Sequence, residues 1–402
     1  MRLTGARLLA ATVVLSTSLC LFASAETLNG MSANPSDHDF GVQGMTALQN
    51  LCYIRKSTQS MQESSHDRNG GNGDAWVKGT ELVNIKGPGQ ITNMWFTWRQ
   101  DIPGGNTFIA KGKIKIYFDG ESSPRINADI ADLVGGKIKP FDTPMALDSS
   151  KSAGGWNFYV PMTFKKSVKV VAEGVGYFHI GYQQLPANSN VKTFTGKEDY
   201  SKVKNMYQSP EALPTKASSG TKVNSSGKLT GSGDKIKLLD VNGSRSIYAI
   251  KVRIPELQTM MAKGDFRDLD PRIDRYKSLL QQIRIRAYWD GEKNPSVDAP
   301  IGSFFTTSIF AAYETKTLAM GILNDGTMYC YLPMPFKSSG KVELIAMGAV
   351  NAEDITAEVY HAPFNGPWEH TGYFKTQENI RTQSGQPVLL LKESGMGQLV
   401  GV

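Results

Sequence analysis

Cysteine is scarce in this chain, with three residues among 402. Cys20 falls within an expected leader, so the mature chain would keep only Cys52 and Cys330. These two thiols could pair in an oxidising compartment, but sequence alone does not show whether they lie close together. Because Cys330 lies within the strand-like run 328–332, a buried free thiol is the favoured interpretation.

Several signatures of known chemistry are absent. The chain has no Ser-His-Asp order of a hydrolytic triad, no His-Glu-x-x-His zinc motif and no phosphate-binding loop. One of its five histidines, His66, lies in a polar loop, but a single histidine does not indicate a metal site. We therefore expect neither a cofactor nor a resident metal ion.

Charge of one sign is not concentrated anywhere. The formal net charge is +7 at pH 7, and the excess is spread over short alternations such as residues 111–115. This pattern indicates a solvated surface rather than a nucleic-acid-binding patch. After the N-terminal leader, no apolar run is long enough to cross a bilayer, so we expect no membrane span.

The segment 1–25 has the parts of a signal peptide. Arg2 and Arg7 give a positive start, residues 8–22 form an apolar stretch, and residues 23–25 read Ala-Ser-Ala. The apolar stretch is too short and poorly flanked for a spanning helix. We expect cleavage near Ala25 and a secreted or periplasmic protein.

Two motifs occur twice in the chain. Tyr-Phe-Asp-Gly-Glu at 117–121 returns as Tyr-Trp-Asp-Gly-Glu at 288–292. Tyr-Val-Pro-Met-Thr-Phe at 159–164 returns as Tyr-Leu-Pro-Met-Pro-Phe at 331–336, so the two spacings differ by a single position. Because two unrelated short matches keep nearly the same offset, the chain contains an internal duplication.

The repeated units are expected to be β-structures. Ile114, Ile116 and Phe118 alternate with Lys113, Lys115 and Tyr117, which is the period of a half-buried strand. Short runs of this kind are separated by turns, and the chain has 40 glycines and 19 prolines to form them. The predicted fold is all-β, with two related jelly-roll or β-sandwich domains in tandem and a few short helices.

The chain is long enough for two domains that each bury a core, and we expect six segments. They are a signal peptide at 1–25, a polar N-terminal segment at 26–79, a first jelly roll at 80–184, a linker at 185–232, a second jelly roll at 233–362, and a connection with the first strand of a truncated following roll at 363–402. Short helices are expected near 44–55, near 200–206 and within 256–282.

The repeated Asp-Gly-Glu motif could supply the two carboxylates of a glycosidase. Both copies, however, follow a strand, where Gly suits a positive φ and Asp can hydrogen-bond the backbone. Two equivalent active sites in one chain would be unusual, so a structural turn is favoured. The residues concerned are Asp119, Gly120, Glu121, Asp290, Gly291 and Glu292.

A polar loop at 63–74 has no apolar residue to bury. Such a loop could bind sugar hydroxyls or a hard cation through oxygen ligands, and a merely solvated Gly-rich loop is an equally good interpretation. An indole face could also stack on a sugar ring. The substrate-binding candidates are Asp67, Arg68, Asn69, Asn72, Asp74 and Trp95.

Four segments carry a family resemblance. Ser-Ser-His-Asp-Arg-Asn-Gly-Gly-Asn at 64–72 resembles the Ser-Ser-Tyr-Asp-Arg-Thr-Gly-Gly-Asn element of glycoside hydrolase family 172. Gly-Pro-Gly-Gln-Ile-Thr-Asn-Met-Trp at 87–95, the Tyr-Trp-Asp-Gly-Glu run at 288–305 and the Met-Pro-Phe element at 334–336 resemble further elements of that family.

The resemblance implies jelly-roll domains, homo-oligomers that are often trimers, and hydrolysis of furanosides such as fructofuranosides or arabinofuranosides. The family carries its catalytic glutamates around a Gly-Thr-Glu-Asp-Tyr motif, which does not occur in this sequence. The nearest string, at 196–200, has Lys for Thr and lies in the expected linker. No catalytic residue is therefore assigned.

Two functions remain open from the sequence. The first is an exported carbohydrate-active protein related to furanoside-cleaving hydrolases and inactive as this chain alone. The second is a non-catalytic module of the cell envelope that binds a furanoside-containing glycan or serves assembly. The sequence does not distinguish a retaining from an inverting outcome, nor does it identify the sugar.

Overall fold

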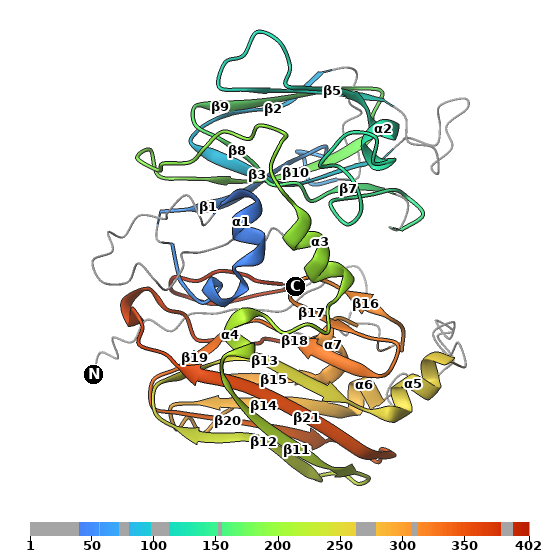
Figure 1. Cartoon of the computed structure of the whole chain (residues 1–402), viewed down its shortest axis with the longest axis vertical. Helices are drawn as coiled ribbons and strands as arrows, with labels where there is room; N and C mark the ends of the chain where they lie inside the picture. The colour runs from blue at the N-terminus through green and yellow to red at the C-terminus, as the bar shows by residue number, and fades with distance from the viewer. Residues whose placement is uncertain are drawn as a thin grey trace. The chain divides into compact units, whose positions relative to one another are not determined.

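A computed structural model describes residues 40–55, 57–71, 80–97, 112–151, 155–262, 279–307, 310, 312–378 and 389–401. These residues divide into two compact units (Figure 1). One unit contains residues 40–47 and those from 55 to 208, and the other contains residues 48–54 and those from 209 onward. Each unit is a sandwich of two antiparallel sheets.

The first sandwich pairs a six-stranded sheet with a four-stranded one. The larger sheet has the order β1 (Gln59–Ser64), β10 (Tyr177–Gln184), β3 (Gly89–Thr97), β7 (Trp156–Phe158) and β6 (Ala146–Leu147), and β8 (Met162–Phe164) also pairs with β3. The smaller sheet has the order β2 (Thr80–Lys86), β9 (Ser167–Glu173), β4 (Lys113–Phe118) and β5 (Ile126–Asp129).

The second sandwich repeats this arrangement. Its larger sheet has the order β11 (Thr221–Leu229), β21 (Ala352–Pro363), β13 (Arg245–Arg253), β18 (Thr327–Cys330), β17 (Met320–Ile322) and β16 (Thr315–Lys316), and β19 (Met334–Phe336) also pairs with β13. Its smaller sheet has the order β12 (Lys235–Asn242), β20 (Ser339–Ala346), β14 (Ile283–Trp289) and β15 (Val297–Pro300). The duplication inferred from two short motifs therefore extends to the strand order of both sheets.

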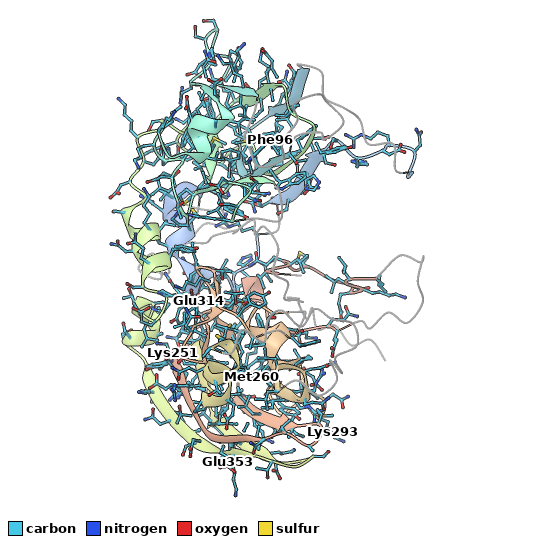
Figure 2. All side chains as sticks on the ribbon, turned by 90° about the vertical axis from the view of Figure 1, so that its right-hand side faces the viewer. Phe96, Lys251, Met260, Lys293, Glu314 and Glu353 are labelled. Carbon is cyan, nitrogen blue, oxygen red and sulfur yellow. The ribbon has the colours of Figure 1, made fainter. Side chains whose placement is uncertain are left out.

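The alternation predicted around residue 114 is confirmed. In β4, Ile114, Ile116 and Phe118 are fully buried, whereas the residues between them are only half-buried. Phe96 of β3, labelled in Figure 2, is also fully buried and packs against Phe158 with ring centroids 5.9 Å apart. Apolar residues on the inner faces of both sheets thus form the core of this sandwich, and the prediction of tandem β-sandwiches is confirmed.

Helices are short wherever the structure describes them. Those in the first unit are α1 (Gly41–Thr46), α2 (Ile130–Val134) and α3 (Ser201–Gln208). Those in the second unit are α4 (Thr215–Ser218), α5 (Pro255–Ala262), α6 (Leu279–Gln282), α7 (Ile301–Phe305) and the 3₁₀ turns η3 (Leu48–Asn50) and η6 (Trp368–His370). Helices lie near all three expected places, although residues 263–278 fall outside the described part of the chain.

Two edge strands lie in segments that composition had suggested to be irregular. Strand β1 falls within the expected polar segment 26–79, and β11 falls within the expected linker 185–232. Both strands are mostly exposed and rich in Ser, Gln, Asn or Lys, so an apolar alternation could not reveal them. Residues 389–401, where the first strand of a following roll was expected, have no regular strand.

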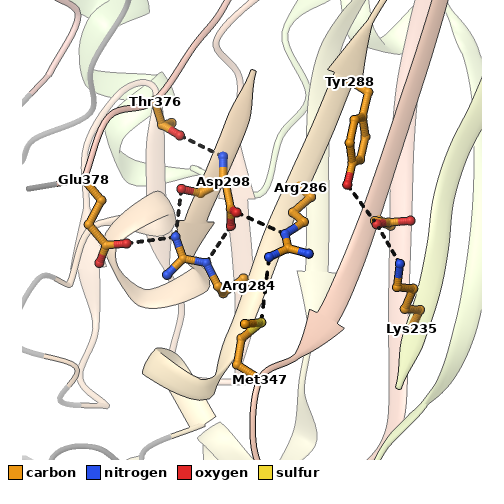
Figure 3. Close-up of polar contacts among 9 residues, drawn as sticks. Lys235, Arg284, Arg286, Tyr288, Asp298, Met347, Thr376 and Glu378 are labelled. Atoms are coloured by element: carbon orange, nitrogen blue, oxygen red, sulfur yellow. Dashed lines mark hydrogen bonds and ion pairs between the residues drawn. The ribbon is translucent and has the colours of Figure 1, made fainter. Parts of the chain in front are cut away.

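Charged residues cover the outer face of the smaller sheet in the second unit (Figure 3). Asp298 of β15 accepts bonds from the guanidinium groups of Arg284 and Arg286, the latter at 3.1 Å. Arg284 also pairs with Glu378 at 2.8 Å, and the backbone N–H of Asp298 donates to Thr376 Oγ1 at 3.0 Å. These bonds hold residues 376–378 against the edge strand β15.

Among the described residues, Cys52 and Cys330 are both free and buried. No helix in the described part of the chain is long and apolar enough to cross a membrane.

Candidate functional site

The loop that follows β1 is organised by its own side chains. Ser64 Oγ lies 2.8 Å from Nδ1 of His66, and Arg68 donates to Glu63 Oε2 and to the carbonyl of Ser64, both at 3.2 Å. Asp67 Oδ1 accepts the backbone N–H of Asn69 at 2.9 Å, which is an Asx-type turn. The side chains of the loop thus bond to one another, and His66, Arg68 and Asn69 are exposed.

This loop begins at an anchored point on the sheet. Ser65 is buried, its N–H donates to the carbonyl of Phe178, and its hydroxyl accepts the Phe178 N–H at 3.2 Å. Because this reciprocal pair fixes Ser65 beside β10, the exposed side chains that follow start from a defined position. Two other predicted candidates, Asn72 and Asp74, lie outside the described residues.

Trp95 lies on the outer face of the same sheet. Its neighbours Met94 and Phe96 are buried in the core, so Trp95 points to the opposite side, where it is half-buried. The indole packs against the exposed imidazole of His179 with ring centroids 5.0 Å apart. A Cβ at residue 155 would lie 1.9 Å from Nε1 of Trp95, so Gly155 is required for this indole position.

Strand register brings the loop and the indole to one face. Ser64 is opposite His179, and His179 is opposite Trp95. Adjacent strands lie about 4.8 Å apart, so Ser64 and Trp95 are separated by about 10 Å across the sheet. We call the set Ser64, His66, Arg68, Trp95 and His179 the aromatic platform. It joins an aromatic face to hydroxyl, imidazole and guanidinium donors.

Sequence reasoning missed His179 as part of this set. It is far from Trp95 along the chain, and only the register of β10 against β3 makes them neighbours. The available signal was the alternation of buried Phe178 and Ile180 around His179, which predicts an outward side chain but not its partner.

The repeated Asp-Gly-Glu motifs form turns. Asp119 and Gly120 have φ values of 51° and 84°, and Asp290 and Gly291 have 53° and 74°. The backbone N–H of the following glutamate donates to the residue before the aspartate in both copies, at 2.9 Å for Glu121 and 3.0 Å for Glu292. Positive φ at both central residues is the type I′ geometry, which favours Asp-Gly.

Both aspartates are occupied by hydrogen bonds. Asp119 Oδ1 accepts the N–H groups of Lys166 and Ser167 at 2.7 and 3.2 Å. Burial alone would raise the pKa of Asp119, but the Thr193 hydroxyl and these amides together hold it below its usual value. A general acid of a glycosidase needs the opposite shift, since it must remain protonated near neutrality.

The two glutamates of the motifs are also engaged locally. Glu121 Oε2 accepts the N–H of Phe118 at 3.1 Å, and the same carboxylate pairs with Arg125. Glu292 accepts the hydroxyl of Ser296. Among the described residues, every carboxyl group whose pKa is shifted is shifted downward, and these are Asp119, Asp142, Asp148, Asp199, Asp234, Asp290, Glu343 and Glu358.

Other tryptophans serve packing. Trp289 is buried, stacks on Phe336 with ring centroids 5.7 Å apart, and donates Nε1–H to the carbonyl of Phe374 at 2.7 Å. Trp156 is buried in the first core, and Trp368 packs on Phe364. Trp98 lies outside the described residues. Of the tryptophans described, Trp95 is the one that presents a ring beside polar side chains on an outer sheet face.

The described residues contain no group of three or more His, Cys, Asp or Glu side chains arranged to hold a metal ion. Within the loop after β1, the Asp67 carboxylate is used by the backbone of Asn69.

Comparison with protein families shows which family the chain belongs to. Residues 56–202 match the GH172 first beta-sandwich domain, and residues 220–359 match a GH172 domain-like description. The chain belongs to glycoside hydrolase family 172. The two GH172 matches coincide with the two sandwiches, and the candidate loop and Trp95 lie within the first. Membership makes this a carbohydrate-active protein related to glycoside hydrolases.

Wider comparisons add little to the GH172 assignment. No curated protein sequence matches the chain significantly. An atomic structure of Sulfolobus Turreted Icosahedral Virus aligns at 9% identity and TM-score 0.20, covering 76% of this chain and 90% of that chain. The crystal structure of the STIV MCP aligns at 9% identity and TM-score 0.19, covering 76% and 96%. Scores this low carry no argument.

Proposed function

We propose that this GH172 protein is exported and binds furanoside-containing glycans on the aromatic platform, without cleaving them as this chain alone. The observation that carries the proposal is the Trp95 ring, which lies on one sheet face with His179 and Ser64, where the loop that carries His66 and Arg68 begins. An aromatic face suits the C–H face of a sugar ring, and the surrounding donors suit its hydroxyls.

The bonding of the motif carboxylates supports the absence of turnover. Asp119 and Asp290 accept backbone N–H groups, and their pKa values are lowered, so neither is suited to donate a proton to a leaving group. Glu121 and Glu292 are bonded to groups of their own turns. The acids of the repeated motif therefore build the sandwich.

Binding is tested by calorimetric titration with two probes, an inulin-type fructofuranose oligomer and an arabinofuranose oligomer. We expect Trp95→Ala to weaken binding at least about tenfold, which corresponds to about 1.4 kcal/mol. Tyr117→Ala is the matched control, because Tyr117 is a half-buried aromatic residue on the other sheet of the same sandwich. Equal losses in both variants, or no binding of either oligomer, would refute the platform.

Turnover is tested separately with nitrophenyl fructofuranosides and arabinofuranosides. We expect no release of nitrophenol by the purified chain. Release that disappears in Glu121→Gln or Glu292→Gln would show that a motif acid is catalytic and would overturn both the turn interpretation and the absence of turnover.

Export and assembly are parts of the same proposal. The motif at 23–25 supports cleavage near Ala25, so N-terminal sequencing of protein recovered outside the cytoplasm should begin at Glu26. The family resemblance supports a homo-oligomer, of three chains in many relatives, and light scattering on the mature protein would measure its mass. A retained leader would contradict export, and a monomer would contradict assembly.

A further inference from the structure

A polar groove crosses the outer face of the larger sheet in the second sandwich. It has a volume of about 540 Å³ and is lined by residues of β11, β21, β13 and the turn that leads into β18. Its lining includes Glu211, Asn224, Ser226, Lys251, Arg253 and Asp325. Pockets for small ligands have volumes of about 300–1,000 Å³, so the groove can hold a sugar residue.

The centre of this groove is the duplicate of the Trp95 position. Strands β3 and β13 both have nine residues, and each has a bulge at its fourth residue, Thr92 in one and Tyr248 in the other. The seventh residue is Trp95 in β3 and Lys251 in β13. The two sandwiches therefore present different chemistry at one equivalent place.

The residues opposite this position on the neighbouring strands also differ between the two sandwiches. In the first sandwich Trp95 is opposite His179, which is opposite Ser64. In the second, Lys251 is opposite Glu358, which is opposite Asn224. An aromatic row has been replaced by a charged and amide-bearing row. A face that stacks sugar rings in one copy is thus suited to recognise charge in the other.

Lys251 has donors left for a ligand. Its Nζ donates to the backbone carbonyl of Glu211 at 2.6 Å, and in the described part of the chain it forms no ion pair. An ammonium group has three N–H donors, so two remain. The side chain is half-buried at the centre of the groove, and Figure 2 marks its place on the second unit.

Three carboxylates lie near Lys251, those of Glu211, Glu358 and Asp325, and the last two are bonded to other partners. Glu358 pairs with Lys222 and accepts the hydroxyl of Tyr360 at 2.7 Å. Asp325 accepts the N–H and hydroxyl of Thr327, each at 2.9 Å, and lies 4.0 Å from Arg253. In the described part of the chain none of the three forms an ion pair with Lys251, although the charge of each favours the charged form of this lysine.

Burial makes the positive charge of Lys251 less favourable. Desolvation lowers the pKa of Lys251, and the charge of Lys222 adds to the lowering, whereas Glu358, Glu211 and Asp325 partly oppose it. A ligand carboxylate placed on Nζ would offset this desolvation with a charge-assisted hydrogen bond.

We propose that the groove binds a carboxylate-bearing saccharide, a uronic-acid residue, with its carboxylate on the Lys251 ammonium group. Arg253, two positions along the same strand, also lines the groove and lies 4.0 Å from Asp325. Hydroxyl and amide groups of Asn224, Ser226 and Thr356 line the remainder and suit the sugar hydroxyls. This site goes beyond the furanoside platform and does not depend on it, because it uses residues of the other sandwich.

The test compares acidic oligosaccharides with an uncharged methyl ester of one of them. Calorimetric titrations of the full chain use trigalacturonate, triguluronate and the methyl ester of trigalacturonate, which keeps the hydroxyls and removes the charge. We expect at least one acid to bind, the ester to bind at least about tenfold more weakly, and binding to fall as salt is raised. Equal binding of acid and ester would overturn the proposal, as would failure of both acids to bind.

Variants locate the site. Lys251→Met keeps the aliphatic stem and should weaken acid binding at least about tenfold, whereas Lys251→Arg should retain part of it. Lys237→Met is the control, since Lys237 is an exposed lysine on the other sheet of the same sandwich. Asn224→Ala, at an exposed position of β11, should weaken binding without disturbing the core. Unchanged binding in both Lys251→Met and Asn224→Ala would overturn the proposal.

The two proposed sites can be separated. Lys251→Met should leave binding of the furanoside oligomers unchanged, and Trp95→Ala should leave binding of the acid unchanged. Loss of both activities in either variant would mean that one of the two assignments is wrong, and melting curves of the variants would show whether the fold was the cause.

Discussion

Asp290 Oδ1 accepts the backbone N–H groups of Ser338 and Ser339 at 2.7 and 3.3 Å, and Asp119 Oδ1 accepts those of the equivalent residues, Lys166 and Ser167, at 2.7 and 3.2 Å. In the first sandwich the carboxylate links the turn after β4 to the start of β9. In the second it links the turn after β14 to the start of β20. The motif is repeated because the same join is needed twice. Because the aspartate oxygen atoms accept backbone hydrogen bonds, the motif has a structural role.

Removing this join should destabilise the fold. We expect Asp290→Ala to lower the free energy of unfolding by about 2 kcal/mol, because hydrogen bonds to a charged group are lost and backbone donors are left unpaired. The midpoint of urea unfolding measures the effect. Asp240→Ala, at an exposed position of the same sandwich, is the control and should change little. Equal effects of the two substitutions would contradict the role given to Asp290.

The same carboxylate gives a pH dependence. Burial would raise the pKa of Asp290, but hydrogen bonds from Tyr373, Ser338 and Ser339 lower it below 3.8. A lowered pKa in the folded state means that the stabilisation is present above the ordinary pKa and is lost as pH falls through the lowered value. We therefore expect Asp290→Asn to be less stable than the parent at neutral pH and to approach it below about pH 4. A difference that stays constant from neutral to strongly acidic pH would refute this.

Gly155 offers a test of the aromatic platform without touching the tryptophan. A Cβ at this position would meet the indole nitrogen of Trp95, so Gly155→Ala should displace the ring. We expect weaker furanoside binding and a change in tryptophan fluorescence, with little loss of stability. Gly231→Ala is the control, because a Cβ there meets nothing closer than 3.8 Å and the backbone is ordinary. Unchanged fluorescence and binding in Gly155→Ala would contradict the geometry.

The two cysteines should behave as buried free thiols. Burial raises the pKa of Cys330 to about 12 and that of Cys52 as well, so neither forms the reactive thiolate near neutrality. We expect a thiol reagent to label both residues only after unfolding, and a reductant to leave the melting temperature unchanged. Rapid labelling of the native protein, or a melting temperature lowered by reductant, would contradict the free and buried state.

Trp289 provides a test of core packing in the second sandwich. Trp289→Phe removes the Nε1–H bond to the Phe374 carbonyl and leaves the stacked Phe336 with a smaller partner. We expect a loss of about 2 kcal/mol in the free energy of unfolding from the lost hydrogen bond and packing volume. Trp368→Phe, at a half-buried position, should cost less. The comparison is made by urea unfolding of the two variants, and an equal or larger loss in Trp368→Phe would contradict the role of Trp289.

Much of the fold could be predicted from local pattern. The alternation at 114–118 places each side chain correctly, and the nearly equal offsets of the two repeated motifs predict two related sandwiches. Strands β1 and β11 could not be predicted in this way, because edge strands with polar side chains lack the apolar alternation that reveals a strand.

Less of the candidate sites could be predicted. Trp95 and the 66–69 loop stood out by composition, but their meeting with His179 depends on register between strands far apart in sequence. Lys251 carried no signal at all. Its equivalence to Trp95 appears only when the bulges at Thr92 and Tyr248 align the two strands, since a one-residue error would turn every side chain to the other face.

The strand order shared by the two sandwiches also poses a problem during folding. Chains with repeated domains tend to misassemble when a strand of one copy enters the other. The position of Phe118 in β4 is that of Trp289 in β14. Trp289 is larger, and its indole N–H needs the carbonyl of Phe374, which belongs to the second unit. An exchanged β14 would bring a larger side chain and a further indole donor into the first core, so we expect Trp289 to favour pairing of β14 within the second sandwich.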